Sequence, residues 1–162
     1  MRWTSQVPGT ISTVMSDGQE LVVFSTGWSS GANGQAAGAG DLTAFDPSTG
    51  ALLWDTEVDG FLLDPDGGGL GGPHSYTQPA MSNQGFIAIG VFGGENGGGQ
   101  LLTFDHAGQP VRRTWLPLTA YAWILNDQGM LEGQDPVFDP DGRVYITGTV
   151  LSDAGWPSGS ML

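Results

Sequence analysis

Six polar residues in two separate stretches are the best candidates for binding a ligand or a metal ion. The first stretch supplies His74, Tyr76 and Gln78, and the second supplies Glu132, Gln134 and Asp135. Imidazole, carboxylate and amide groups are common ligands of metal ions and of polar small molecules. Hydrogen bonding between the two stretches themselves is the simpler alternative, and the sequence leaves both possibilities open.

Two glycine-containing motifs resemble catalytic or phosphate-binding signatures but lack the required context. Residues 27–31 fit the G-x-S-x-G pattern of a serine hydrolase, which needs a strand, a sharp turn and then a helix. A Gly/Ala-rich segment follows instead, and a related stretch near the C-terminus has Pro157 in place of the serine. Residues 67–72 fit G-x-G-x-x-G, but Pro73 follows where a phosphate-binding helix would start. We therefore identify no catalytic residue.

Turn chemistry explains the remaining candidates. Residues 64–67 and 139–142 both read Asp-Pro-Asp-Gly, but neither continues to the further ligands and distal Glu of a calcium loop. Asp, Pro and Gly are the residues that tight turns prefer. His106 also falls in a predicted turn, where we expect it to be solvated.

The composition excludes several classes of function. The 162 residues suffice for one domain, and the 17 acidic residues outnumber the 4 basic ones, giving a net charge of −13. Such a chain has no basic patch for nucleic acid or an anionic membrane. The absence of cysteine excludes disulfides, cysteine–zinc sites and thiol catalysis. No apolar run is long enough to insert into a membrane, and the first residues lack the apolar core of a signal peptide.

The stretch Leu42–Trp54 (LTAFDPSTGALLW) organises the chain. Asp46-Pro47-Ser48-Thr49-Gly50 has the residues of a tight turn, so the whole stretch predicts a β-hairpin. A degraded copy, LLTFDHAGQPVRRTW, occupies residues 101–115. Such repetition indicates a repeat architecture.

The elements around these hairpins predict an all-β fold, a partial β-propeller with about two and a half four-stranded antiparallel blades in an open arc. Residues 1–9 would be the last strand of a preceding blade, 10–60 a first blade, 74–116 a second, and 132–162 an incomplete third containing two strands. Residues 116–131 predict either a short helix or an extra strand. The first strand of a blade is innermost, so the six candidate residues, which lie just before such strands, should share one rim of the central channel.

Residues 44–54 resemble the tryptophan-docking motif of PQQ-like β-propellers, the quinoprotein-dehydrogenase-like superfamily. The motif reads Ala-x-Asp-x-x-Thr-Gly-x-x-x-Trp and matches Ala44, Asp46, Thr49, Gly50 and Trp54. The resemblance implies that Trp54 packs between neighbouring blades and that Asp46 orders its turn. The second copy keeps Asp105 and Trp115, loses the Thr and has a longer Gly-to-Trp spacing.

The resemblance implies a fold more strongly than an activity. Quinoprotein dehydrogenases would require a PQQ-stacking aromatic, a calcium ion held by Glu and Asn, and a catalytic Asp, none of which can be assigned here. We therefore expect a non-catalytic binding or scaffolding module, part of a larger secreted or periplasmic protein, whose partners are the remaining blades or another protein. A fragment of a PQQ-dependent dehydrogenase, with PQQ and calcium, is one alternative. A secreted propeller that binds carbohydrate or a surface is another.

Three further expectations concern the arrangement of the chain. The glycine-rich stretches 27–40 and 93–99 should both fall between the second and third strands of a blade, on one face of the array. The segment at Trp3 should be poorly paired, and the residues after Gly155 loosely held. The blade faces at the two ends should lack partners and favour association.

Overall fold

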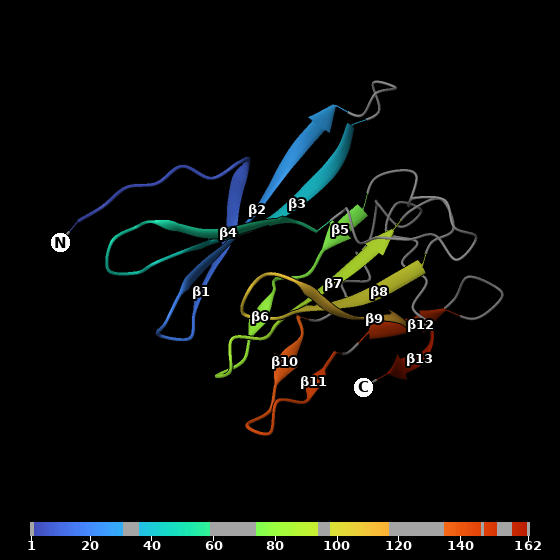
Figure 1. Cartoon of the computed structure of the whole chain (residues 1–162). Helices are drawn as coiled ribbons and strands as arrows, with labels where there is room; N and C mark the ends of the chain where they lie inside the picture. Colours follow the sequence, from blue (N-terminus) through green and yellow to red (C-terminus); the bar gives the residue numbers. More distant parts are fainter. Residues whose placement is uncertain are drawn as a thin grey trace.

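The computed structural model describes residues 2–30, 36–58, 74–93, 98–116, 135–146, 148–151 and 157–161. Every regular element in this part of the chain is a β-strand, and all the strand pairs are antiparallel (Figure 1). The predicted all-β class is therefore confirmed.

The first sheet contains four strands in chain order. They are β1 (Thr10–Ser16), β2 (Leu21–Ser30), β3 (Ala36–Phe45) and β4 (Leu52–Glu57). Asp17 closes the β1–β2 turn by accepting hydrogen bonds from the backbone N–H groups of Gln19 (2.8 Å) and Glu20 (3.0 Å). Short turns of this kind favour pairing between consecutive strands, which gives the simple meander order.

The second sheet has the same order, with its first strand broken in two. Its strands are β5 (His74–Tyr76), β6 (Ala80–Met81), β7 (Ile87–Gly93), β8 (Gly98–Phe104) and β9 (Pro110–Leu116). Both β5 and β6 pair with β7, and Pro79, which has no N–H to donate, lies in the break. At the break, Thr77 makes the hydrogen bonds to β7 that the ladder lacks there. Its hydroxyl accepts the N–H of Gly90 (2.9 Å), and its own N–H donates to the Gly90 carbonyl (2.9 Å).

The last part of the chain forms two short antiparallel pairs. They are β10 (Val137–Phe138) with β11 (Val144–Tyr145), and β12 (Gly148–Leu151) with β13 (Pro157–Met161). The expectation that the third unit contains two strands is wrong, because four strands lie in this part of the chain. Residues 157–161 pair with β12, and the loose attachment expected after Gly155 stays a prediction. Residues 117–134, which include the predicted helix or extra strand, lie outside the described part.

The glycine-rich stretch 27–40 is also more regular than expected. The prediction that it falls between the second and third strands is wrong for most of its length, because residues 27–30 belong to β2 and residues 36–40 to β3, and the ladder continues as far as the Ser30–Ala36 pair. Backbone hydrogen bonds form the ladder regardless of side chain, and small residues allow a close approach between sheets. A Cβ on Gly40 would lie 3.0 Å from the ring of Tyr76. In Figure 1 the β2–β3 and β7–β8 hairpins end on the same side of the array.

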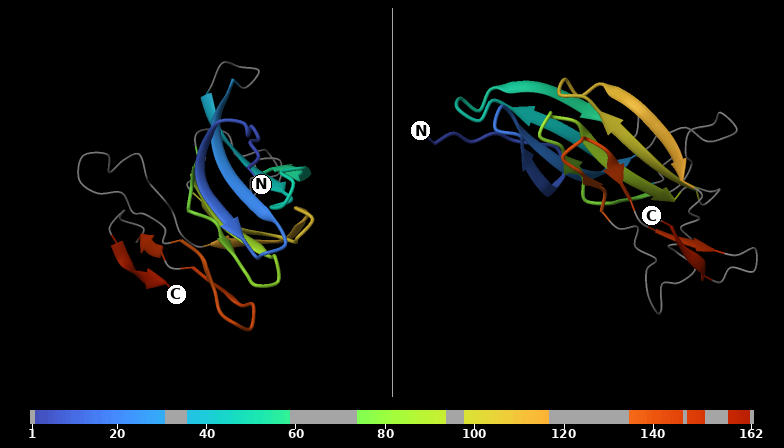
Figure 2. Two further views of the ribbon diagram at one scale, coloured as in Figure 1. Left: turned by 90° about the vertical axis from the view of Figure 1, so that its left-hand side faces the viewer. Right: turned by 90° about the horizontal axis from the view of Figure 1, so that it is seen from below.

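The two sheets stack on each other, as Figure 2 shows, and they share an apolar core. The core takes buried residues from both sheets: Val22, Phe24, Leu42, Ala44, Val58, Ile87, Ile89, Val91, Leu102 and Phe104. The first strands of the successive units are neighbours, since β6 contacts both β1 and β10. Equivalent edges of the units therefore lie on the same side of the array.

Candidate functional site

Trp54 joins the first sheet to the β8–β9 turn of the second. Its indole N–H donates to the carbonyl of His106 (2.9 Å) and lies 3.0 Å from Oε2 of Glu20. The partly buried ring packs on Gly108, where a Cβ would lie only 2.5 Å from the ring. Gly108 also has φ +69, a backbone conformation that favours glycine. Glycine at this position therefore serves both the turn and the tryptophan.

Thr56 adds a second hydrogen bond to the same turn. Its hydroxyl donates to the carbonyl of Gly108 (2.9 Å), and its side chain is buried. Trp54 and Thr56 are two positions apart on β4, so both point to the same face of the strand. Together they fix the turn at two points.

Trp3 and Ser5 make the same pair of contacts one unit earlier. The indole N–H of Trp3 donates to the carbonyl of Pro47 (3.0 Å), and the hydroxyl of Ser5 donates to the carbonyl of Gly50 (3.2 Å). A Cβ on Gly50, which has φ +74, would lie 2.5 Å from the Trp3 ring. Residues 2–7 belong to no strand, in keeping with the poor pairing expected at Trp3. The N-terminal segment thus docks through side chains.

Asp46 orders the turn that receives Trp3. Its Oδ1 accepts hydrogen bonds from the Ser48 hydroxyl (2.6 Å) and from the backbone N–H groups of Ser48 (2.7 Å) and Thr49 (3.0 Å). These bonds, led by the one from the Ser48 hydroxyl, lower the pKa of Asp46. Asp105 accepts two backbone N–H groups in the turn that receives Trp54.

Trp115 is not the counterpart of Trp54. Ala44 pairs with Trp54 across β3 and β4, and at the matching place in the second sheet Thr103 pairs with Arg112. Trp115 lies three residues later, pairs with Gln100, and its side chain is 40% exposed. The longer spacing of the second motif copy therefore moves its tryptophan to the other face of the strand.

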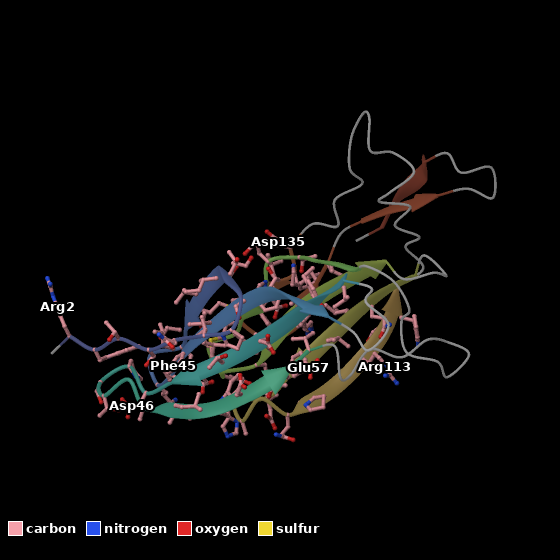
Figure 3. The ribbon with its side chains drawn as sticks, turned by 90° about the horizontal axis from the view of Figure 1, so that it is seen from above. Arg2, Phe45, Asp46, Glu57, Arg113 and Asp135 are labelled. Carbon is pink, nitrogen blue, oxygen red and sulfur yellow. The ribbon has the colours of Figure 1, made fainter. Side chains whose placement is uncertain are left out.

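Two of the predicted rim residues meet. The backbone N–H of Gln78 donates to Oδ1 of Asp135 (2.8 Å), and the Gln78 amide donates to the hydroxyl of Ser12 (3.2 Å). Ser12, Gln78 and Asp135 each lie four residues before a turn residue whose side chain accepts a backbone N–H. These acceptors are Ser16, Ser82 and Asp139, respectively. The three are therefore equivalent positions in successive units. In Figure 3 Asp135 lies along one edge of the array, and Glu57 and Arg113 lie along the other.

The other rim candidates are placed differently. Tyr76 does not share the rim, because its partly buried ring packs edge-on against Phe24 between the sheets, with 5.5 Å between ring centroids. His74 pairs through its backbone with Gly93 on β7. Glu132 and Gln134 lie outside the described residues.

Two of the remaining motifs have structural roles, whereas the motifs at residues 64–67 and 67–72 lie outside the described residues. Gly27–Ser30 continue strand β2, which contradicts the strand–turn–helix context of a nucleophile elbow. Asp139 accepts the N–H of Arg143 (2.8 Å) and the hydroxyl of Tyr145 (3.1 Å), so its carboxylate serves the turn. The backbone bond from Arg143 is the main reason that the pKa of Asp139 is lowered.

Sequence reasoning missed Ser5, Thr56 and Glu20. The signal for the first two was present, because Trp-x-Ser at 3–5 and Trp-x-Thr at 54–56 share one pattern. Glu20 precedes the apolar strand β2 with no local sign that it reaches Trp54. Both residues belong to the first sheet, and only the tertiary structure shows that the β1–β2 turn lies against Trp54 of β4.

Comparison with family models, curated proteins and solved structures finds no match to this chain. Across the described residues, no three or more His, Cys, Asp or Glu side chains are grouped so that they could hold a metal ion. The same residues include no helix of a length and apolarity that would cross a membrane. The contacts between units are therefore the features of the molecule that bear on its function.

Proposed function

We propose that the chain is part of a β-propeller that serves as a non-catalytic binding or scaffolding module. The two stacked sheets would be consecutive blades, and β10–β13 part of a further blade, in an open arc. The observation that carries this proposal is the repeated docking contact, in which Trp and a hydroxyl two residues later hold the turn of the next unit. A contact that repeats from unit to unit is what a blade array requires.

The hydrogen-bonded row Ser12–Gln78–Asp135 supports the same arrangement. In a propeller the first strands of all blades converge on the central axis, so equivalent positions on these strands come within hydrogen-bond distance. In a parallel stack of sheets, the inner and outer edges would be equally spaced. The resemblance to PQQ-like propellers adds the expectation of a secreted or periplasmic protein whose partners are further blades or another protein.

Spin labels would test the convergent arrangement. The chain has no cysteine, so cysteine pairs can be introduced and labelled without background. We expect the inner pair Ser12 and Gln78 to give a clearly shorter distance by electron paramagnetic resonance than the outer pair Asp55 and Arg113, which occupy matching places on β4 and β9. Equal distances would contradict the propeller.

Cofactor addition would test the non-catalytic assignment. The purified chain is mixed with PQQ and calcium, and absorbance and dye reduction with alcohol substrates are followed. We expect no spectral shift and no dye reduction. Reduction that depends on both PQQ and calcium would favour the dehydrogenase alternative.

A further inference from the structure

An open pocket of about 540 Å³ lies where the β1–β2 turn of the first sheet meets the β6–β7 and β8–β9 turns of the second. Its size falls within the range of small-molecule sites. Eight residues line it: Asp17, Gln19, Glu20, Leu53, Trp54, Gln84, His106 and Ala107. It lies at the turns, so it is separate from the Ser12–Gln78–Asp135 row on the first strands.

The pocket contains a buried carboxylate with an unused oxygen. The Glu20 side chain is 6% exposed, and its Oε2 accepts the indole N–H of Trp54 at 3.0 Å. Its Oε1 is buried and has no hydrogen-bond partner. A buried charged oxygen without a partner is unfavourable, and a donor that reached Oε1 by displacing the side chains that cover it would remove that cost.

The surroundings of Glu20 favour a positively charged donor. Asp17, a second carboxylate of the pocket, reaches toward the second sheet, where its Oδ2 would lie 3.1 Å from a Cβ on Gly85. No arginine lines the pocket, and the net charge of the chain is −13. Leu53 and the Trp54 ring supply apolar surface for methylene groups, and Gln19 and Gln84 supply amide oxygens.

We propose that this pocket binds an alkylammonium group, either the end of a lysine side chain or a free aliphatic amine. On binding, the Glu20 side chain turns so that Oε1 meets the ammonium group, which lies within the field of Asp17, and the methylene groups contact Leu53 and Trp54. Charge-assisted hydrogen bonds of this kind are stronger than neutral ones. The inference depends on contacts between the two stacked sheets and does not require the propeller arrangement.

Calorimetric titration tests the proposal with three probes. Nα-acetyl-lysine methylamide represents a peptide source, 1,4-diaminobutane a free amine, and Nα-acetyl-norleucine methylamide the same side chain without the ammonium group. We expect binding of at least one amine and none of the norleucine probe, with a shift of the Trp54 indole N–H resonance. Binding of the lysine probe alone assigns a peptide source, and binding of the diamine alone assigns a free amine.

Glu20→Gln should weaken amine binding at least about tenfold, the ratio expected for one hydrogen bond to a charged group. Glu57→Gln is the matched control, because it removes the same charge from an exposed residue of β4 outside the pocket, and we expect it to leave the affinity unchanged. If Glu20→Gln does not fold, Asp17→Asn, which keeps an acceptor for the turn, provides the same test. Failure of both amines to bind, equal binding of the norleucine probe, or unchanged affinity in the variant that folds would overturn the proposal.

Discussion

The contact between units depends on a tryptophan of one unit that packs on a glycine in a turn of the next unit. The indole ring is large and flat and carries one N–H donor, so it can cover a turn and still bond to one carbonyl of that turn. It fits only because Gly50 and Gly108 have no Cβ at the place where the ring lies. The hydroxyls of Ser5 and Thr56 then bond to those same glycines.

Trp54→Ala should lower the free energy of unfolding by about 3 kcal/mol, the lower end of the range for an aromatic deletion, since the ring is only partly buried. Trp54→Phe should cost about 1–2 kcal/mol, because it keeps the ring but removes the donor to His106 and Glu20. Urea denaturation measures both. Trp115→Ala is the control and should cost less than about 1 kcal/mol. A larger loss at Trp115 than at Trp54 would reverse the assignment.

Glu20 should make stability depend on pH in an unusual direction. Desolvation by burial raises its pKa above 4.5, although the bond from Trp54 opposes the shift. The folded state therefore takes up the proton more readily than the unfolded state, so the cost of the ionised carboxylate is present above the raised pKa and relieved as pH falls toward 4.5.

Glu20→Gln, which removes this charge, should gain stability relative to the parent chain at pH 8 and lose that gain by pH 4. Parallel urea titrations at several pH values give the difference directly. A difference that grows as the pH falls would show that the ionised Glu20 is instead favourable in the folded state.

At the scale of elements, the turns between the third and fourth strands carry the docking contact. An Asp accepts backbone N–H groups at the start of each turn, and a glycine with positive φ ends it. This local closure holds carbonyl oxygens outward, where the tryptophan and hydroxyl of the neighbouring unit reach them.

Gly108→Ala should destabilise the protein by at least about 3 kcal/mol, because the methyl group meets the Trp54 ring in addition to straining the backbone. Gly18→Ala is a matched control, since Gly18 also has positive φ but nothing lies within 4 Å of a Cβ there. It should cost about 1 kcal/mol, the backbone term alone. Thermal or urea unfolding compares the two, and equal losses would mean that the docking contact adds nothing.

The whole molecule is dominated by its negative charge. With a net charge of −13, the folded chain repels itself, and compaction brings the carboxylates closer together. Arg143 forms ion pairs with Asp139 and Asp141, and these lie on an exposed turn, where such pairs contribute little to stability. The screening of charge repulsion by salt should therefore affect the stability more than the weakening of ion pairs does.

Raising sodium chloride from 20 to 500 mM should increase the melting temperature. At 500 mM the screening length is only a few Å, so the repulsion between surface charges is weakened. Scanning calorimetry at fixed pH measures the change, and sodium sulfate at equal ionic strength separates screening from preferential exclusion. A melting temperature that fell with salt would show that favourable ion pairs outweigh the repulsion.

The sequence alone predicted the parts of this protein that depend on local chemistry. The turn at Asp46–Gly50, the meander order of the strands and the role of Asp46 follow from residue types a few positions apart. The strand ends were less predictable, because the ladder through residues 27–40 depends on backbone pairing that small side chains neither favour nor forbid.

Only the tertiary structure decided which distant residues meet. The shift of Trp115 to the other face follows from the register of β9 on β8, which the Gly-to-Trp spacing alone does not reveal. Tyr76 does not lie on the predicted rim, because its ring packs against Phe24 between the sheets. The unused oxygen of Glu20 arises where two sheets pack together, and burial of a polar atom by a distant segment leaves no local trace in the sequence.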